Sequence, residues 1–241
     1  MTPQLSPQTS PQLTPFTAAI FDMDGLLIDS ERAIMQAWIG AAREIGITLA
    51  ASDYVQVIGK AKPESDAFLV SLLGDERAFR QVQAMAGAQL HAPAAGPRFP
   101  LKPGAKELLS ALRAAGIPCA VASSSRVEEI EDRLGRVGVL DFFSSVSGGD
   151  EVRRGKPDPA LYQLAAERLG VAPQACLAFE DSENGATAAS RSGAQVVVVP
   201  DIKPPSAVVT GFSFRVLGTL HEAIPFVPQW FDRTGPAGLE P

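Results

Sequence analysis

Residues Phe21 to Ser30, which read FDMDGLLIDS, place two carboxylates where an apolar segment ends. The preceding residues 17–21 are short and apolar, which predicts a strand buried on both faces of a parallel sheet. Alternate residues of an extended segment point the same way, so Asp22 and Asp24 start on a common side unless the turn at Gly25 re-aims the second. Such a pair implies a shared proton or a hard cation such as Mg²⁺, although an isolated motif of this kind also fits a solvated turn.

The composition limits the classes of protein that the chain can belong to. Its 241 residues are 46% apolar, enough for one large domain or for a domain with an insertion. The net charge is −6 and the basic residues are scattered, so we expect neither a nucleic-acid nor an anionic-membrane partner. No stretch has the ~18 apolar residues of a membrane helix, and no signal peptide is recognisable.

The two cysteines indicate the cellular compartment. Cys119 and Cys176 both lie in apolar runs that predict strands. We interpret them as buried free thiols rather than a disulfide framework, which indicates a reducing environment. The sequence therefore predicts a cytoplasmic protein.

Helical periodicity alone covers the segment that follows the first strand. A helix is predicted from Ser30, its expected cap, to Gly46, and further helices follow up to residue 92. From residue 100, helices alternate with short apolar strands, as in a parallel sheet covered by helices on both faces. The strands are expected at 117–122, 143–146, 176–179, 195–199 and 214–216.

This order predicts a doubly wound, Rossmann-like α/β core with an inserted all-helical cap. The helical segment interrupts the alternating series after its first strand, so the chain crosses between core and cap twice. The predicted boundaries are a core over 16–29 and 98–227, a cap over 30–97, and tails over 1–15 and 228–241.

Polar residues stand where several of these strands end, and ligands of open α/β sheets bind at that edge. Ser123 and Ser124 open a helix, where hydroxyl and N–H groups favour a phosphate, although they also suit an ordinary cap. Lys156 lies in a loop stiffened by prolines, and Glu180 and Asp181 follow a later strand. So many carboxylates cannot accept a phosphate without a divalent cation, so we expect Mg²⁺ among them.

With Mg²⁺ and Lys156 neutralising a phosphoryl group, Asp22 can attack phosphorus in line. Asp24 can then protonate the leaving alkoxide and later deprotonate the water that hydrolyses the aspartyl-phosphate. The residues thus fit phosphoryl transfer through a covalent intermediate.

The ordered set of Asp22-x-Asp24-Gly25, Ser123, Lys156-Pro157 and Glu180-Asp181 resembles the four motifs of the haloacid dehalogenase superfamily, and the helical insertion resembles its C1 cap. Within it, the chain is most similar to the branch of β-phosphoglucomutase and of sugar- or nucleotide-phosphate phosphatases such as pseudouridine-5′-phosphatase. The resemblance implies that Asp22 is the nucleophile and Asp24 the general acid/base. It also implies phosphate binding by Ser123 and Lys156, and magnesium binding by Asp22, Asp24 through its main-chain carbonyl, Glu180 and Asp181.

Two departures from the mutase relatives favour hydrolysis. Those relatives carry a histidine twelve residues after the nucleophile, where this chain has Ile34, and an arginine in the cap loop, where it has Lys62. Lys60 and Lys62 are predicted to contact the substrate, or else to lie in a solvated loop. We therefore expect a phosphatase of a small phosphorylated metabolite, monomeric or weakly dimeric; a sugar-phosphate mutase and a non-catalytic binding protein are the alternatives.

Overall fold

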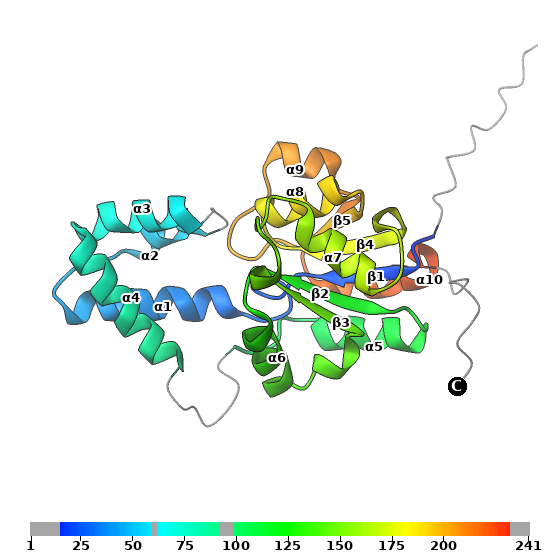
Figure 1. The fold of residues 1–241 in the computed structure, drawn as a ribbon, viewed down its shortest axis with the longest axis horizontal. Coiled ribbons are helices and arrows are strands. Elements are labelled where there is room, and N and C mark those ends of the chain that lie inside the picture. The colour runs from blue at the N-terminus through cyan, green and yellow to red at the C-terminus, as the bar shows by residue number, and fades with distance from the viewer. Residues whose placement is uncertain (1–14, 59–61, 92–98, 232–241) are drawn as a thin grey trace, which may run out of the picture.

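A six-stranded parallel sheet forms the centre of the molecule, in the order β3-β2-β1-β4-β5-β6 (Figure 1). The computed structural model describes residues 15–58, 62–91 and 99–231. The strands are β1 (Ala18–Phe21), β2 (Cys119–Ser123), β3 (Ser145–Gly148), β4 (Cys176–Glu180), β5 (Gln195–Val198) and β6 (Arg215–Val216). The predicted doubly wound parallel sheet is confirmed.

Alternate residues of the strands supply two separate apolar cores, one on each face of the sheet. In β1, Ala19 and Phe21 belong to one cluster, and Ala18 and Ile20 to the other. The first face is covered by α5 (Ala105–Ala114), α6 (Val127–Arg136), η5 (Leu220–Phe226) and α10 (Val227–Trp230). The second is covered by α7 (Ala160–Arg168), α8 (Glu183–Ser192) and α9 (Ala207–Phe212). β1 is buried on both faces, as its apolar sequence predicts.

The helical insertion has an apolar cluster of its own. It consists of α1 (Ser30–Glu44), α2 (Ala51–Tyr54), η1 (Val55–Val57), α3 (Lys62–Leu73) and α4 (Glu76–His91). α1 and α4 lie side by side, to one side of the sheet (Figure 1), around Trp38, Phe79 and Val82. Ile34 and Leu90 lie at the junction, because each packs against both this cluster and the sheet core. The domain boundaries themselves stay a prediction.

Two local details differ from the sequence prediction. The strand predicted near 143–146 begins two residues later, because Phe143 packs edge-on against Phe21, with ring centroids 6.1 Å apart, before the chain pairs with β2. Ser30 is not the cap of α1: it is the first helical residue, and its buried Oγ has no hydrogen-bond partner in the described part of the chain. Asp29 occupies the cap position, although its side chain makes no capping hydrogen bond.

The structure describes the first four residues of the segment 228–241, which the sequence predicts to be a tail. Trp230 and Phe231 are buried, and Phe231 forms an isolated parallel bridge with Phe16, just before β1. The Phe16 amide donates to the Trp230 carbonyl at 2.8 Å. These aromatic rings bury their apolar surface in the sheet core, so residues 230 and 231 are part of that core.

Two expectations drawn from composition can be compared with the structure. Cys119 and Cys176 are buried free thiols in β2 and β4, as predicted. Over residues 15–58, 62–91 and 99–231, none of the helices combines the length and hydropathy that a membrane span requires.

Candidate active site

The turn after β1 holds the two motif aspartates on a rigid base. The Asp22 amide donates to the Phe179 carbonyl of β4 at 3.0 Å, which extends the sheet pairing by one residue. Beyond it, the amides of Gly25 and Leu27 donate to Ile28 and Met23 carbonyls, each at 2.9 Å. Residues Met23, Leu26, Leu27 and Ile28 are all buried in the sheet core. Apolar packing therefore fixes the loop from which Asp22 and Asp24 project.

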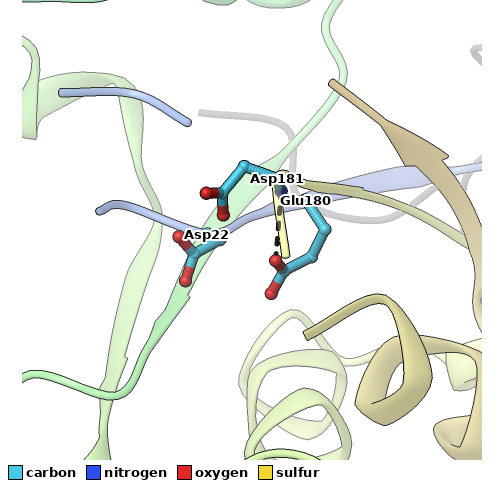
Figure 2. A group of neighbouring side chains, drawn as sticks. All are labelled: Asp22, Glu180 and Asp181. Atoms are coloured by element: carbon cyan, nitrogen blue, oxygen red, sulfur yellow. Dashed lines mark hydrogen bonds between the residues drawn. The ribbon is translucent and has the colours of Figure 1, made fainter. Parts of the chain in front are cut away.

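Three carboxylates converge at the ends of β1 and β4. One oxygen each of Asp22, Glu180 and Asp181 lies within 4.8 Å of the others, and Figure 2 shows the three groups around a common space. Asp22 and Glu180 are buried and Asp181 is half-buried. Oxygen-only ligands of this kind suit a hard cation such as Mg²⁺. The structure thus gathers three of the four predicted metal ligands through their carboxylates.

Lys156 supplies the positive charge of this cluster. Its Nζ lies 2.5 Å from Asp22 Oδ1 and 2.6 Å from Glu180 Oε1, and its side chain is 6% exposed. The Tyr162 hydroxyl donates to the same Glu180 oxygen at 2.6 Å. Burial alone would lower the pKa of Lys156, but the carboxylates of Asp22 and Glu180 raise it above its ordinary value. The lysine is therefore fixed in its charged form beside the predicted nucleophile.

Glu180 is the least free of the three carboxylates. Its Oε1 accepts from Lys156 and Tyr162, while its Oε2 accepts from the Asp181 and Ser182 amides at 3.2 and 3.3 Å and from the Ser182 hydroxyl at 3.2 Å. The oxygens of Asp22 and Asp181 have fewer protein donors and are thus the more available to a cation.

Two glycines let the chain approach these carboxylates. A Cβ at Gly185 in α8 would overlap the Glu180 carboxylate, and one at Gly25 would overlap that of Asp181. Gly25 also has φ +86°, in the left-handed region that favours glycine. Both positions are therefore restricted to glycine by the acidic cluster itself.

The electrostatics show an excess of negative charge. Burial, with the charges of Glu180 and Asp24, raises the pKa of Asp22 to about 8 even though Lys156 opposes the shift. Burial and the neighbouring carboxylates also raise the pKa of Asp181 well above its usual range. Three acids face one lysine, so without a further cation protons are retained to balance the charge. A divalent cation would neutralise this excess, which is why the residues fit Mg²⁺.

Asp24 points to a different set of partners. Its Oδ2 accepts from the Ser125 hydroxyl at 2.9 Å and its Oδ1 from Arg133 Nη1 at 3.0 Å. Its carboxylate is thus outside the cluster of Asp22, Glu180 and Asp181, in keeping with the expectation that it would ligate only through its main chain. The turn at Gly25 has re-aimed the second aspartate.

The two serines predicted to bind phosphate lie at the end of β2 and directly after it. Ser123 is buried at the end of β2, beside β1, and its Oγ accepts from the Ser125 amide at 3.1 Å. Ser124 is exposed next to it. Lys60 and the side chain of Lys62 lie outside the described residues.

A second polar group links the insertion to the core beside the site. Asp201, in the loop after β5, accepts from Arg32 at 2.7 Å and from Lys102 at 2.5 Å through the same oxygen. Lys203 in this loop donates to the Ile58 carbonyl at 2.9 Å. Nearby, burial and the charges of Asp24 and Asp201 raise the pKa of Glu31 to about 7. These contacts hold the start of α1 against the strand ends.

Tyr162 and Arg133 are not among the predicted site residues, although the sequence carries a signal for each. Tyr162 stands beside Leu161 on the apolar face of its helix, where a polar hydroxyl needs a partner. Arg133 lies between Ile130 and Leu134 at helix spacing, so it belongs to the buried side of α6. A polar group on a buried face indicates a specific contact.

The comparisons with known proteins agree with this geometry. The family model of the haloacid dehalogenase-like hydrolases matches residues 16–193, which contain every motif described above. The chain belongs to this family. A Drosophila melanogaster protein named as a probable pseudouridine-5′-phosphatase is 35% identical over 234 residues, covering 91% of this chain and 95% of the relative. The phosphorylated carbohydrates phosphatase of Thermotoga maritima is 30% identical over 176 residues, covering 73% and 81%.

Among solved structures, a haloacid dehalogenase family hydrolase from Deinococcus radiodurans with bound phosphate and sodium superposes with a TM-score of 0.73. It is 28% identical, and the match covers 89% of this chain and 96% of that one. The family match and the phosphatases among the relatives show that this protein is a phosphoric monoester hydrolase.

Proposed function

We propose that this hydrolase is a Mg²⁺-dependent phosphatase of a small sugar phosphate or nucleoside monophosphate, working through an aspartyl-phosphate. The observation that carries the proposal is the contact of buried Lys156 with Asp22 and Glu180, beside Asp181. The relatives named for phosphorylated carbohydrates and for pseudouridine 5′-phosphate support this class of substrate.

In the proposed mechanism, Asp22 is the nucleophile, and the hydrogen bond that its amide donates to the Phe179 carbonyl of β4 aligns it. An Asp22 oxygen bonds to phosphorus while the bond from phosphorus to the leaving oxygen breaks, and Asp24 gives that oxygen a proton. A water then attacks phosphorus, Asp24 takes its proton, and the Asp22 carboxylate is released. Lys156 and Ser123 would hold the phosphoryl oxygens between the two steps.

Asp22 and Asp181 are proposed to hold Mg²⁺, with Glu180 contributing charge and fixing Lys156, and with the Asp24 carbonyl as a further ligand. When bound, the ion would supply the positive charge that lets a phosphate dianion approach these acids. The opposed charges at the cluster support this role, because a single lysine faces three carboxylates.

Hydrolysis is proposed over mutase activity. Ile34, which replaces the histidine of the mutase relatives, packs against both apolar clusters and offers no hydrogen bond to a reorienting intermediate. An incubation with β-glucose 1-phosphate and a trace of the 1,6-bisphosphate distinguishes the two. Phosphate release without matching glucose 6-phosphate is expected; glucose 6-phosphate without phosphate release would make the chain a mutase.

The function is tested by assaying purified protein on a panel of phosphorylated metabolites, with EDTA and with added Mg²⁺. Activity is expected only with the ion, and Asp22→Asn should abolish it. Asp141→Asn, an exchange of the same kind on the exposed surface, is the matched control and should keep full activity. Full activity in EDTA, or near-normal turnover of Asp22→Asn, would refute the proposal.

Three finer points are also proposals. Lys60 and Lys62 are proposed to contact the leaving group, so Lys62→Ala should change substrate preference more than the rate on a generic aryl phosphate. The enzyme is proposed to act in the cytoplasm, and as a monomer or weak dimer, which gel filtration at two concentrations would test.

A further inference from the structure

Arg133 of α6 is held on several sides beside Asp24. Its Nη1 donates to Asp24 Oδ1 at 3.0 Å and lies 3.4 Å from the Ser125 hydroxyl. Its Nη2 is 3.6 Å from Glu129 on the same helix, and its guanidinium carbon lies 5.1 Å from the ring centroid of Phe99. The arginine reaches Asp24 across 109 positions of sequence.

The burial of this pair sets it apart from the other ion pairs of α6. The side chains of Arg133 and Asp24 are only 19% and 22% exposed. Arg136, one turn later on the same helix, pairs with Asp132 at 60% and 55% exposure. Exposed pairs of the second kind are mobile and contribute little, whereas a partly buried charge pair fixes the orientation of both groups.

We propose that Arg133 is a positioning residue that, with Ser125, holds the Asp24 carboxylate in the orientation needed for both proton transfers. The inference rests on the proposed function, in which one carboxylate first gives a proton to the leaving oxygen and later takes one from water. Each Asp24 oxygen has its own protein donor, Arg133 at Oδ1 and Ser125 at Oδ2. A carboxylate held at both ends keeps its place while the leaving group is exchanged for water.

The two steps can be separated by the choice of leaving group. 4-Nitrophenolate leaves phosphorus as a stable anion, so transfer from 4-nitrophenyl phosphate to Asp22 does not need a proton from Asp24. Hydrolysis of the aspartyl-phosphate still needs Asp24 to take a proton from water. A sugar phosphate, with an alkoxide leaving group, needs Asp24 in both steps.

The test compares Arg133→Met, Arg133→Lys and the matched control Arg136→Met with the wild type. On a sugar phosphate that the wild type hydrolyses, Arg133→Met should lower kcat at least about tenfold, because misplacing a catalytic group costs rate, and leave KM nearly unchanged. On 4-nitrophenyl phosphate it should give a fast burst of one nitrophenolate per site followed by slow turnover. Arg133→Lys should recover part of the rate, and Arg136→Met should match the wild type.

Each result is decisive for the role of Arg133. Wild-type rates for Arg133→Met on both substrates would refute the proposal, as would a burst slowed as much as turnover, since that indicates general disruption of the site. Should Arg133→Met fail to fold, Ser125→Ala carries the same test, with the burst kept and turnover slowed. An inactive wild-type protein would instead refute the proposed function, so failure of that proposal is distinguishable from failure of the role proposed for Arg133.

Discussion

The Tyr162 hydroxyl donates a 2.6 Å hydrogen bond to Glu180, on the same oxygen that accepts from Lys156. All three side chains are buried or nearly so. Tyr162→Phe should therefore lower the free energy of unfolding by about 1–3 kcal/mol, because a buried carboxylate loses a donor. Tyr54→Phe is the matched control, since that hydroxyl has no hydrogen bond to the described residues, and should cost less in a urea titration. Equal losses would mean that the bond to Glu180 does not stabilise the fold.

Alanine at two helical glycines should have opposite effects. Gly185→Ala would drive a Cβ into the Glu180 carboxylate, displacing it from Lys156, so both stability and activity should fall. At Gly135 of α6 a Cβ meets nothing within 4 Å, so Gly135→Ala should raise the free energy of unfolding by up to about 1 kcal/mol through helix propensity. Thermal melting and phosphatase assays check both; an active, stable Gly185→Ala protein would contradict the close approach.

The metal-free protein should lose stability as pH rises. Folding raises the pKa of Asp22 from 3.8 to about 8, so its contribution is full below the unfolded value and is lost as pH rises through about 8. Mg²⁺ binds the deprotonated carboxylates, so the stabilisation it adds should grow over the same range. Melting temperatures in EDTA and in Mg²⁺ from pH 5 to pH 8.5 measure both trends. Asp22→Asn should flatten them, and a magnesium effect independent of pH would argue against ligation by Asp22.

Neutralising Asp201 should loosen the junction of insertion and core. Its side chain is 2% exposed and accepts from Arg32 and Lys102, so Asp201→Asn weakens two charged contacts. A loss of about 1–3 kcal/mol in the free energy of unfolding is expected. Asp132→Asn, which breaks an exposed pair within α6, should cost at most about 0.5 kcal/mol. If the two variants unfold at the same denaturant concentration, the buried junction contributes no more than a surface pair.

The strands could be predicted because their apolar runs are short and separated by helical periodicity. Their exact starting residues could not, and β3 shows why: it begins only after Phe143 has packed against Phe21, where the chain comes into register with β2. Ser30 has the residue type of a cap, yet its burial against the core turns the hydroxyl inward. Local preference gave way to tertiary packing at both places.

The acidic residues of the site could be predicted because the carboxyl ends of parallel strands meet at one edge. The residues that hold them could not be inferred in the same way, since Arg133 and Tyr162 come from helices whose rotation depends on packing. The orientation of Asp24 was likewise open in the sequence, because a single glycine turn decides whether it faces Asp22 or the helix α6.

The bridge between Phe16 and Phe231 brings both ends of the described chain to one place. Phe16 precedes β1, whereas Asp22 follows it, so this meeting point lies at the opposite edge of the sheet from the acidic cluster. A reporter or surface anchor attached before residue 15 or after residue 231 would therefore join the core at the end of β1 away from the acidic cluster. The same proximity makes a circularly permuted enzyme practicable, with a short linker joining these ends and new ends opened in an exposed loop.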